Sequence, residues 1–296
     1  MLQLPLNERL VLYVVLVVYL IASAVAVRQL SARGRKYRRI LISLIALGVC
    51  LQSVLLIFRA VSLKAFPLTG LFESMIFLGM AFGLAYLFLS ILMPQVWFAS
   101  AMTWIMLLIA LLGAKVASPV SEVREAARTP WAVAHGLAMT LAAAMIAFAT
   151  VSAWMYLLAN KRLKNKELGK VLGRMPNIEK LGRMNVFGIE AGFVLLSFGL
   201  FTGLGMAAIQ IRMSQSTLAE WLIDPKIVLI ILAWLLLAAI LALRPLVRLS
   251  GKAVAWLTMV AFFLIIFAIV GVTFFCGTRH VFSQAAAAVV LVMEAV

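Results

Sequence analysis

Charged, chelating and thiol side chains are scarce in this 296-residue chain. Only 12% of its residues are charged, and it has two histidines and two cysteines. Two cysteines do not suggest a disulfide framework. The sequence also has no P-loop, G-x-S-x-G or H-E-x-x-H motif, which excludes the best-marked nucleotide-binding and hydrolytic chemistries of soluble proteins.

Most residues of the chain are apolar instead. Apolar residues make up 66% of it, and the mean hydropathy is +1.14. Eight apolar runs have the length of membrane-spanning helices, roughly 17–29 residues. Because lipid cannot satisfy an exposed strand edge, the sequence predicts an all-α integral membrane protein, a polytopic bundle of about eight transmembrane helices. The predicted spans are Leu10–Val27, Ile40–Phe58, Gly70–Met93, Trp97–Ala114, Trp131–Leu158, Val186–Gln210, Ile227–Leu243 and Ala253–Cys276.

The net charge of +16 is carried by the loops between these runs. Of the 26 Lys and Arg residues, 17 lie on the side reached after the first, fifth and seventh spans. The positive-inside rule makes that side cytoplasmic and places both termini outside. The charge therefore indicates topology in a bacterial-type inner (plasma) membrane, and a nucleic-acid partner is not expected.

The two histidines share one predicted membrane depth. His135 lies about one turn inside the fifth span, and His280 follows the eighth, so both fall at the predicted outer face. Two neutral imidazoles could provide both axial ligands of a haem iron or two ligands of another metal, whereas a structural zinc needs four. The alternative is a pair of interfacial histidines, each hydrogen-bonded to a neighbour. Spacing alone leaves both interpretations open.

Three ionisable residues lie near the same face. Glu73 is one turn into the third span, Arg59 ends the second, and Arg279 precedes His280. Because a buried carboxylate in hydrocarbon is costly unless paired, we expect an ion pair between Glu73 and Arg59. The arginines could instead bind haem propionates or extend to the interface.

Four stretches resemble motifs of the cytochrome c assembly protein family, which includes the membrane subunits that handle haem in c-type cytochrome biogenesis and their HemX-like relatives. The resemblance covers about residues 64–280, within a single predicted transmembrane domain of residues 1–280 followed by a short interfacial or disordered tail, 281–296. The stretches are Pro67-Leu-Thr-Gly-Leu-Phe-Glu-Ser-Met-Ile-Phe-Leu78, Trp131-Ala-Val-Ala-His135, Leu181-Gly-Arg-Met-Asn185 through Phe198-Gly-Leu-Phe-Thr-Gly203, and Gly277-Thr-Arg-His280.

The resemblance implies that His135 and His280 are the axial ligands of a non-covalently bound haem b. In the family, these histidines flank a tryptophan-rich loop that reads W-G-x-x-W-x-W-D-P-K-E. The corresponding stretch here is Ala219-Glu-Trp-Leu-Ile-Asp-Pro-Lys226, which keeps Trp221 and Asp224 but lacks the glycine and most tryptophans. This departure favours the shorter HemX-like branch.

Three functions follow as alternatives. The resemblance implies a haem-binding protein of cytochrome c maturation that holds or passes haem at the outer face. Its partners would be a membrane protein of the same system and apocytochrome c, and it would be at most part of a haem-attachment system. The second alternative is a HemX-like accessory protein that affects haem synthesis without transfer. The third, a small-solute transporter using Glu73 and Glu190, predicts inverted repeats, and the sequence shows none.

Overall fold

The computed structural model describes residues 4–31, 35–68, 70–92, 96–116, 129–166, 177–214 and 222–272. Within these ranges the chain forms helices joined by short turns, and no strand occurs in them. The predicted all-α class is confirmed. Six helices of the described residues are long and apolar enough to cross a membrane, so the chain is a multi-pass membrane protein.

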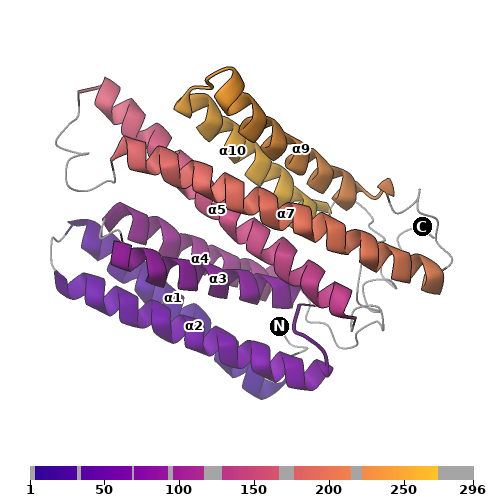
Figure 1. Cartoon of the computed structure of the whole chain (residues 1–296). Coiled ribbons are helices and arrows are strands. Elements are labelled where there is room, and N and C mark those ends of the chain that lie inside the picture. The colour runs from indigo at the N-terminus through magenta and orange to yellow at the C-terminus, as the bar shows by residue number, and fades with distance from the viewer. Residues whose placement is uncertain are drawn as a thin grey trace, which may run out of the picture. The chain divides into compact units, whose positions relative to one another are not determined.

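Each of the first seven predicted spans matches one helix, with at most one residue of the span beyond either helix end (Figure 1). The eighth span begins as an α-helix and continues as the π-helix η2, and its last residues, 273–276, lie outside the described ranges. Most helices extend past the apolar run that predicted them. Their bounds are α1 Leu6–Ser31, α2 Arg35–Leu63, α3 Leu71–Leu92, α4 Val96–Val116, α5 Pro130–Lys164, α7 Ile178–Ser214, α9 Pro225–Leu246, α10 Gly251–Ile266 and η2 Phe267–Gly271.

Helix starts are set by short polar side chains that accept hydrogen bonds from the first turn. The Thr129 hydroxyl accepts from the Ala132 N–H at 3.3 Å before α5, and the Ser250 hydroxyl accepts from the Ala253 N–H at 3.2 Å before α10. Such caps satisfy N–H groups that have no partner within the helix. Pro130 follows Thr129 at the first helical position, where the missing N–H costs nothing. This local signal determines where α5 begins, and therefore the turn on which His135 lies.

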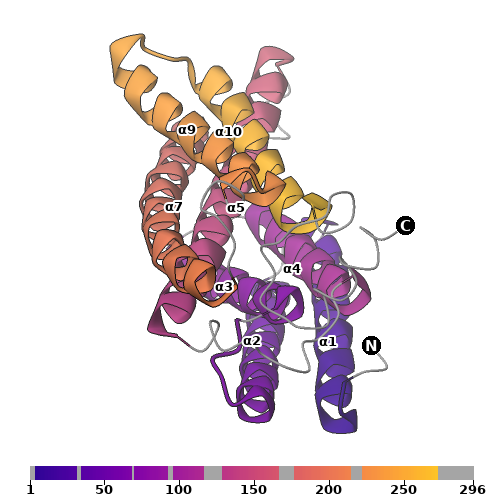
Figure 2. The ribbon, with the colours of Figure 1, turned by 90° about the vertical axis from the view of Figure 1, so that its right-hand side faces the viewer.

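The described helices form two compact units. Unit 1 comprises the described parts of residues 1–62, 71–119 and 155–181, and so contains α1, most of α2, α3 and α4. Its four helices lie side by side, with α4 packed against both α1 and α3 (Figures 1 and 2). A buried hydrogen bond of 2.7 Å from the Tyr19 hydroxyl to Gln52 Oε1 joins α1 to α2.

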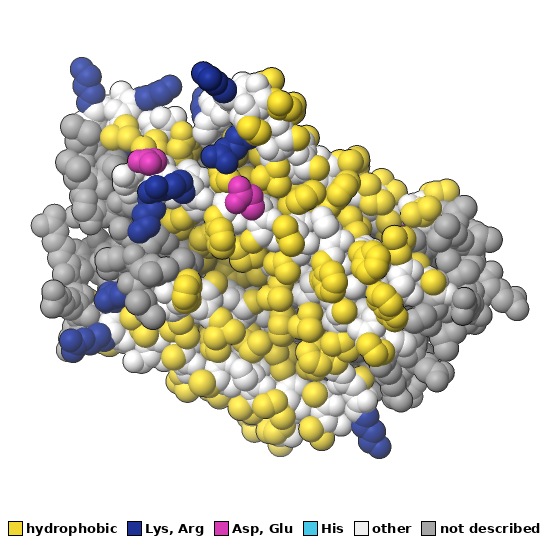
Figure 3. Space-filling view, viewed as in Figure 1, with side chains coloured by type: hydrophobic (Ala, Val, Ile, Leu, Met, Phe, Trp, Pro, Cys, Tyr) yellow, Lys and Arg dark blue, Asp and Glu magenta, His cyan; other side chains and the backbone are white. Residues whose placement is uncertain are grey.

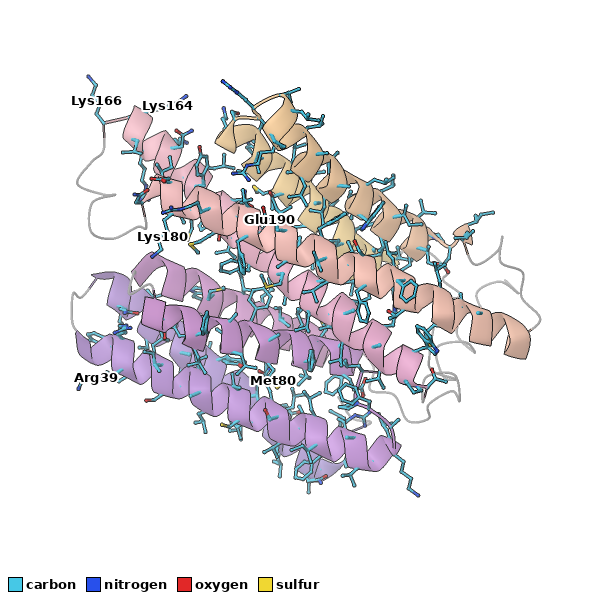
Figure 4. All side chains as sticks on the ribbon, in the orientation of Figure 1. Arg39, Met80, Lys164, Lys166, Lys180 and Glu190 are labelled. Atoms are coloured by element: carbon cyan, nitrogen blue, oxygen red, sulfur yellow. The ribbon has the colours of Figure 1, made fainter. Side chains whose placement is uncertain are left out.

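Basic residues gather at one end of unit 1. Arg39, Lys164, Lys166 and Lys180 come from the start of α2, the end of α5 and the start of α7, and they lie at the same end of the helices (Figure 4). This grouping is the one expected if the loops after the first and fifth spans share a side. The cytoplasmic identity of that side remains a prediction.

Unit 2 comprises the described parts of residues 63–70, 120–154 and 182–296. Here α5 and α7 approach closely along four glycines of α7, Gly188, Gly192, Gly199 and Gly203, which form two G-x-x-x-G pairs. A Cβ built at Gly188 would lie 3.0 Å from the Met145 carbonyl oxygen. Small residues allow helix backbones to approach in this way, which compensates for the absence of a hydrophobic driving force in lipid.

Polar side chains join α7 to α9 and α10 in unit 2. The Trp234 indole of α9 donates to the Ser197 hydroxyl at 2.8 Å and stacks on Phe193. The Thr258 hydroxyl of α10 lies 3.1 Å from Asn185 Oδ1, and both residues are buried. The helices α9 and α10 lie side by side (Figure 2). These bonds determine which faces of α9 and α10 meet α7.

The surface has the pattern of a protein surrounded by lipid. Hydrophobic side chains cover the middle of the face shown in Figure 3, and Lys and Arg side chains lie toward its ends. Large apolar residues such as Phe88, Val194 and Phe263 are well exposed. In water such a surface would promote association, whereas in a bilayer it is the solvated surface.

Candidate functional site

His135 is positioned by the start of α5. Its helix begins at Pro130, so the imidazole lies on the second turn, where its side chain is partly buried. Trp131, one turn earlier on the same face, packs edge-on against Phe201 of α7 with ring centroids 6.2 Å apart. The Thr129 hydroxyl reaches Met206 Sδ at 3.5 Å. These contacts hold the beginning of α5 against α7.

The imidazole is oriented by a backbone carbonyl of the neighbouring helix. His135 Nδ1 lies 2.8 Å from the carbonyl oxygen of Gly199 in α7. A carbonyl can only accept a hydrogen bond, so Nδ1 carries the proton and donates it. In the neutral ring the lone pair is then on Nε2, which is the nitrogen able to bind a metal. A hydrogen bond of this kind, on the nitrogen that does not bind the metal, also fixes the orientation of a ligating ring and raises its basicity.

Glycines of α7 provide the space that this imidazole occupies. A Cβ built at Gly203 would lie 3.1 Å from Cε1 and 3.2 Å from Nδ1 of His135. A Cβ at Gly205 would lie 2.7 Å from the Trp131 ring. A Cβ at Gly205 would force the Trp131 ring to shift, and a Cβ at Gly203 would require the imidazole to move by a few tenths of an ångström. The ring therefore has its present position because α7 carries no side chain there.

Three of the four family-like stretches meet around His135. Leu68, from the first stretch, lies against Gly136, the residue after the histidine. A Cβ added at Gly136 would lie 3.1 Å from the Leu68 Cβ. Gly199 and Gly203, from the third stretch, contact the imidazole itself. These residues are separated by at least 64 positions in the sequence, yet they form one site in unit 2. Hydropathy alone gave no indication of this meeting.

Arg59 and Glu73 form the expected ion pair, in unit 1. The Arg59 Nε and one terminal nitrogen both donate to Glu73 Oε1, the first at 2.8 Å. The other terminal nitrogen lies 3.4 Å from Oε2 of Glu8, whose second oxygen accepts from the Ser62 hydroxyl at 2.9 Å. All three charged residues are at most 5% exposed. The predicted pair is confirmed, and Glu8 is a member that the sequence did not indicate.

The only sequence signal for Glu8 was its rarity. The chain has ten acidic residues, and this one precedes the first apolar run. Buried carboxylates seek cationic partners, but nothing in the sequence places α1 beside the end of α2. The cluster gives Arg59 two anionic partners within the protein and gives Glu73 a structural role. A contact of Arg59 or Glu73 with a cofactor remains a prediction.

Asp224 has a local structural role at the start of α9. Its side chain accepts from the Lys226 N–H at 2.9 Å, and Pro225 occupies the first helical position. The Asp-Pro-Lys sequence thus forms a cap, a helix-starting proline and the first turn.

Replacing Asp224 with alanine should destabilise the first turn of α9 by about 1 kcal/mol, because the Lys226 N–H would lose its side-chain acceptor. Asp224→Asn keeps the acceptor and should retain most of the stability. Chemical unfolding in detergent measures the difference. Equal losses for the two variants would show that the carboxylate charge, rather than the cap, is what stabilises this turn.

The other predicted site residues, His280, Arg279 and Trp221, lie outside the described residues. Their assignments as ligand, propionate contact and loop aromatic remain predictions. Among the described candidates, the structure brings His135 together with Gly199 and Gly203, and Arg59 together with Glu73 and Glu8.

The fold and this site define a polytopic helical membrane protein with one oriented histidine near a helix end. The family model of the cytochrome c assembly protein matches residues 68–279. The chain belongs to the cytochrome c assembly protein family.

The chain is 27% identical over 240 residues to the cytochrome c biogenesis protein CcsA of Prochlorococcus marinus strain NATL2A, and the match covers 70% of this chain and 73% of that protein. It is 26% identical over 258 residues to the protein of the same name from Prochlorococcus marinus strain SARG, covering 78% and 80%. Family membership gives the chain a role in cytochrome c maturation.

Proposed function

We propose that this protein binds haem b non-covalently in the maturation of c-type cytochromes, with His135 and His280 as axial ligands, and holds or passes it at the outer face of a bacterial inner membrane. The observation that carries the proposal is the 2.8 Å contact between His135 Nδ1 and the Gly199 carbonyl. It leaves the Nε2 lone pair for a metal, in a member of a family named for cytochrome c assembly.

The donor set suits haem in number and type. A haem iron takes four ligands from the porphyrin, so the protein needs to supply at most two. This chain has two histidines in all. When bound, haem supplies the iron coordination and redox chemistry, and the protein contributes ligation, orientation and shielding. The side-chain-free surface of α7 at Gly199 and Gly203 keeps the imidazole of His135 in position for that task.

The proposed partners are those of a haem-handling membrane protein. A second membrane protein of the maturation system and apocytochrome c are the expected ones, and both relatives described above are named cytochrome c biogenesis proteins. The incomplete tryptophan loop at residues 219–226 supports the second candidate, a HemX-like accessory that affects haem synthesis without transfer. The histidine pair favours neither candidate over the other.

Absorption spectroscopy of the protein purified in mild detergent tests the ligand assignment. Wild type, as isolated or after added haem, should show a low-spin bis-histidine spectrum. His135→Ala and His280→Ala should each lose the low-spin bands, because one axial position would be left to water or remain empty. Thr150→Val, on α5 but far along it, is the control and should retain the spectrum. Wild-type protein that takes up no haem would contradict the proposal.

Deletion of the gene separates the two candidate functions. Loss of c-type cytochromes with normal haem levels supports maturation. Changed levels of haem-synthesis enzymes with intact c-type cytochromes support the accessory role. Complementation with His135→Ala then shows whether the phenotype depends on the histidine site.

A further inference from the structure

The carbonyl of Gly199 lies within hydrogen-bond distance of two side-chain donors. His135 Nδ1 lies 2.8 Å from it, and the hydroxyl of Thr202 lies 3.0 Å from the same oxygen. Thr202 is 1% exposed, so bulk water does not compete for its hydroxyl. The imidazole of α5 and the hydroxyl of α7 therefore meet at one acceptor.

The Thr202 hydroxyl has a choice of acceptors, but only one proton. It lies 2.9 Å from the Phe198 carbonyl, the usual partner four residues earlier in a helix, and 3.0 Å from that of Gly199. A hydroxyl donates one hydrogen bond. The Gly199 carbonyl oxygen has two lone pairs, and inside α7 it also accepts from the backbone N–H four residues on, so its donors compete. Each donor that shares an oxygen withdraws electron density from it and weakens the other bonds it accepts. The hydroxyl thus limits how strongly Gly199 can hold the imidazole N–H.

We propose that Thr202 is a positioning residue for His135, which sets through the shared Gly199 carbonyl how strongly the imidazole donates electrons to a metal on Nε2. This inference rests on the proposed haem-binding function. A stronger Nδ1–H bond gives the ring more imidazolate character and raises its basicity as a ligand. A more basic axial ligand favours ferric over ferrous iron, and hydrogen bonding around a ligand is one of the means by which proteins tune haem potentials.

The reduction potential of haem bound to the full-length protein is the first measurement. Thr202→Val keeps the volume of the side chain and removes the hydroxyl, so the midpoint potential should shift to lower values. Thr202→Ser keeps the hydroxyl and should restore the wild-type potential. The matched control is Thr150→Val: the Thr150 hydroxyl of α5 donates to the carbonyl of Ile146, four residues earlier, at 2.8 Å, far from His135. This control should leave the potential unchanged.

Nitrogen NMR of haem-free protein provides a second, independent measurement. With ¹⁵N-histidine labelling and the His280→Gln substitution, His135 is the only labelled histidine, because the chain has two. Its spectrum should show protonated Nδ1 and unprotonated Nε2. Thr202→Val should move the Nδ1 signal in the direction of a stronger hydrogen bond, and Thr150→Val should not.

The outcomes separate this inference from the proposed function. If wild type binds haem but Thr202→Val changes neither the potential nor the Nδ1 signal more than Thr150→Val does, the role of Thr202 is wrong and haem binding stands. An upward shift of the potential would also overturn it. If no haem binds while the Nδ1 signal moves, the proposed function fails, and the tuning role fails with it.

Discussion

Replacing Arg59 with methionine should destabilise the protein by about 3–5 kcal/mol, because it removes the guanidinium that pairs with the buried carboxylates of Glu8 and Glu73. The two glutamates are 1% and 0% exposed, so water cannot take over the role of the guanidinium without opening unit 1. Methionine keeps much of the side-chain volume, so the loss reports the charge rather than a cavity. Chemical unfolding in detergent measures the change in free energy.

Two controls make this result specific to the cluster. Arg39→Met removes an exposed arginine from the start of α2 and should change stability by no more than about 0.5 kcal/mol. Adding Glu8→Gln and Glu73→Gln to Arg59→Met should recover much of the loss, since neutral amides do not need a counter-charge. If Arg59→Met were as stable as Arg39→Met, the ion cluster would not contribute to the fold as described.

Replacing Gly203 with valine should weaken haem binding by about 10–100-fold, the usual cost of disturbing a ligand's supporting contacts. Even a methyl group there would lie 3.1 Å from Cε1 of His135, and the valine methyls would have to displace the ring. The hydrogen bond from Nδ1 to the Gly199 carbonyl would then be lost or misaligned. Haem titration followed by absorption gives the affinity.

A second glycine of α7 distinguishes a displaced ligand from poor helix packing. Gly192 is also at the contact with α5, where a Cβ would lie 2.6 Å from Cγ1 of Ile146. Gly192→Val should therefore destabilise the α5–α7 contact by about 1–3 kcal/mol while the folded protein keeps its haem affinity. Equal losses of affinity in the two variants would show that the effect of Gly203 is general packing and not contact with His135.

The sequence predicted the helices well because lipid allows few alternatives. A long apolar run must satisfy its backbone internally, so hydropathy fixes both the type and the approximate place of each element. The boundaries were less accurate. The fifth run was expected to end at Leu158, but α5 continues to Lys164, because the helix persists through basic residues that lie at the end of unit 1.

The site was predicted less completely. The pairing of Arg59 with Glu73 followed from the cost of an unpaired carboxylate in hydrocarbon, and it is confirmed. Glu8 was missed because its partner lies 51 residues away on a different helix. Asp224 was interpreted as a site residue through the family resemblance, and the structure adds a capping role that is purely local.

By itself the sequence determined that the chain is an all-helical membrane protein, where its spans lie, and that its imidazoles are only two, His135 and His280. Those properties depend on the amino-acid composition and on where the apolar runs lie along the chain, and a hydropathy profile shows both directly. Only the tertiary structure decided that the Gly199 carbonyl of α7, which Thr202 also approaches, meets His135 of α5, and that Glu8 joins Arg59. The reason is physical: in lipid, the choice of partners among helices depends on close packing of small residues and on a few polar contacts, and neither leaves a periodic signal in the sequence.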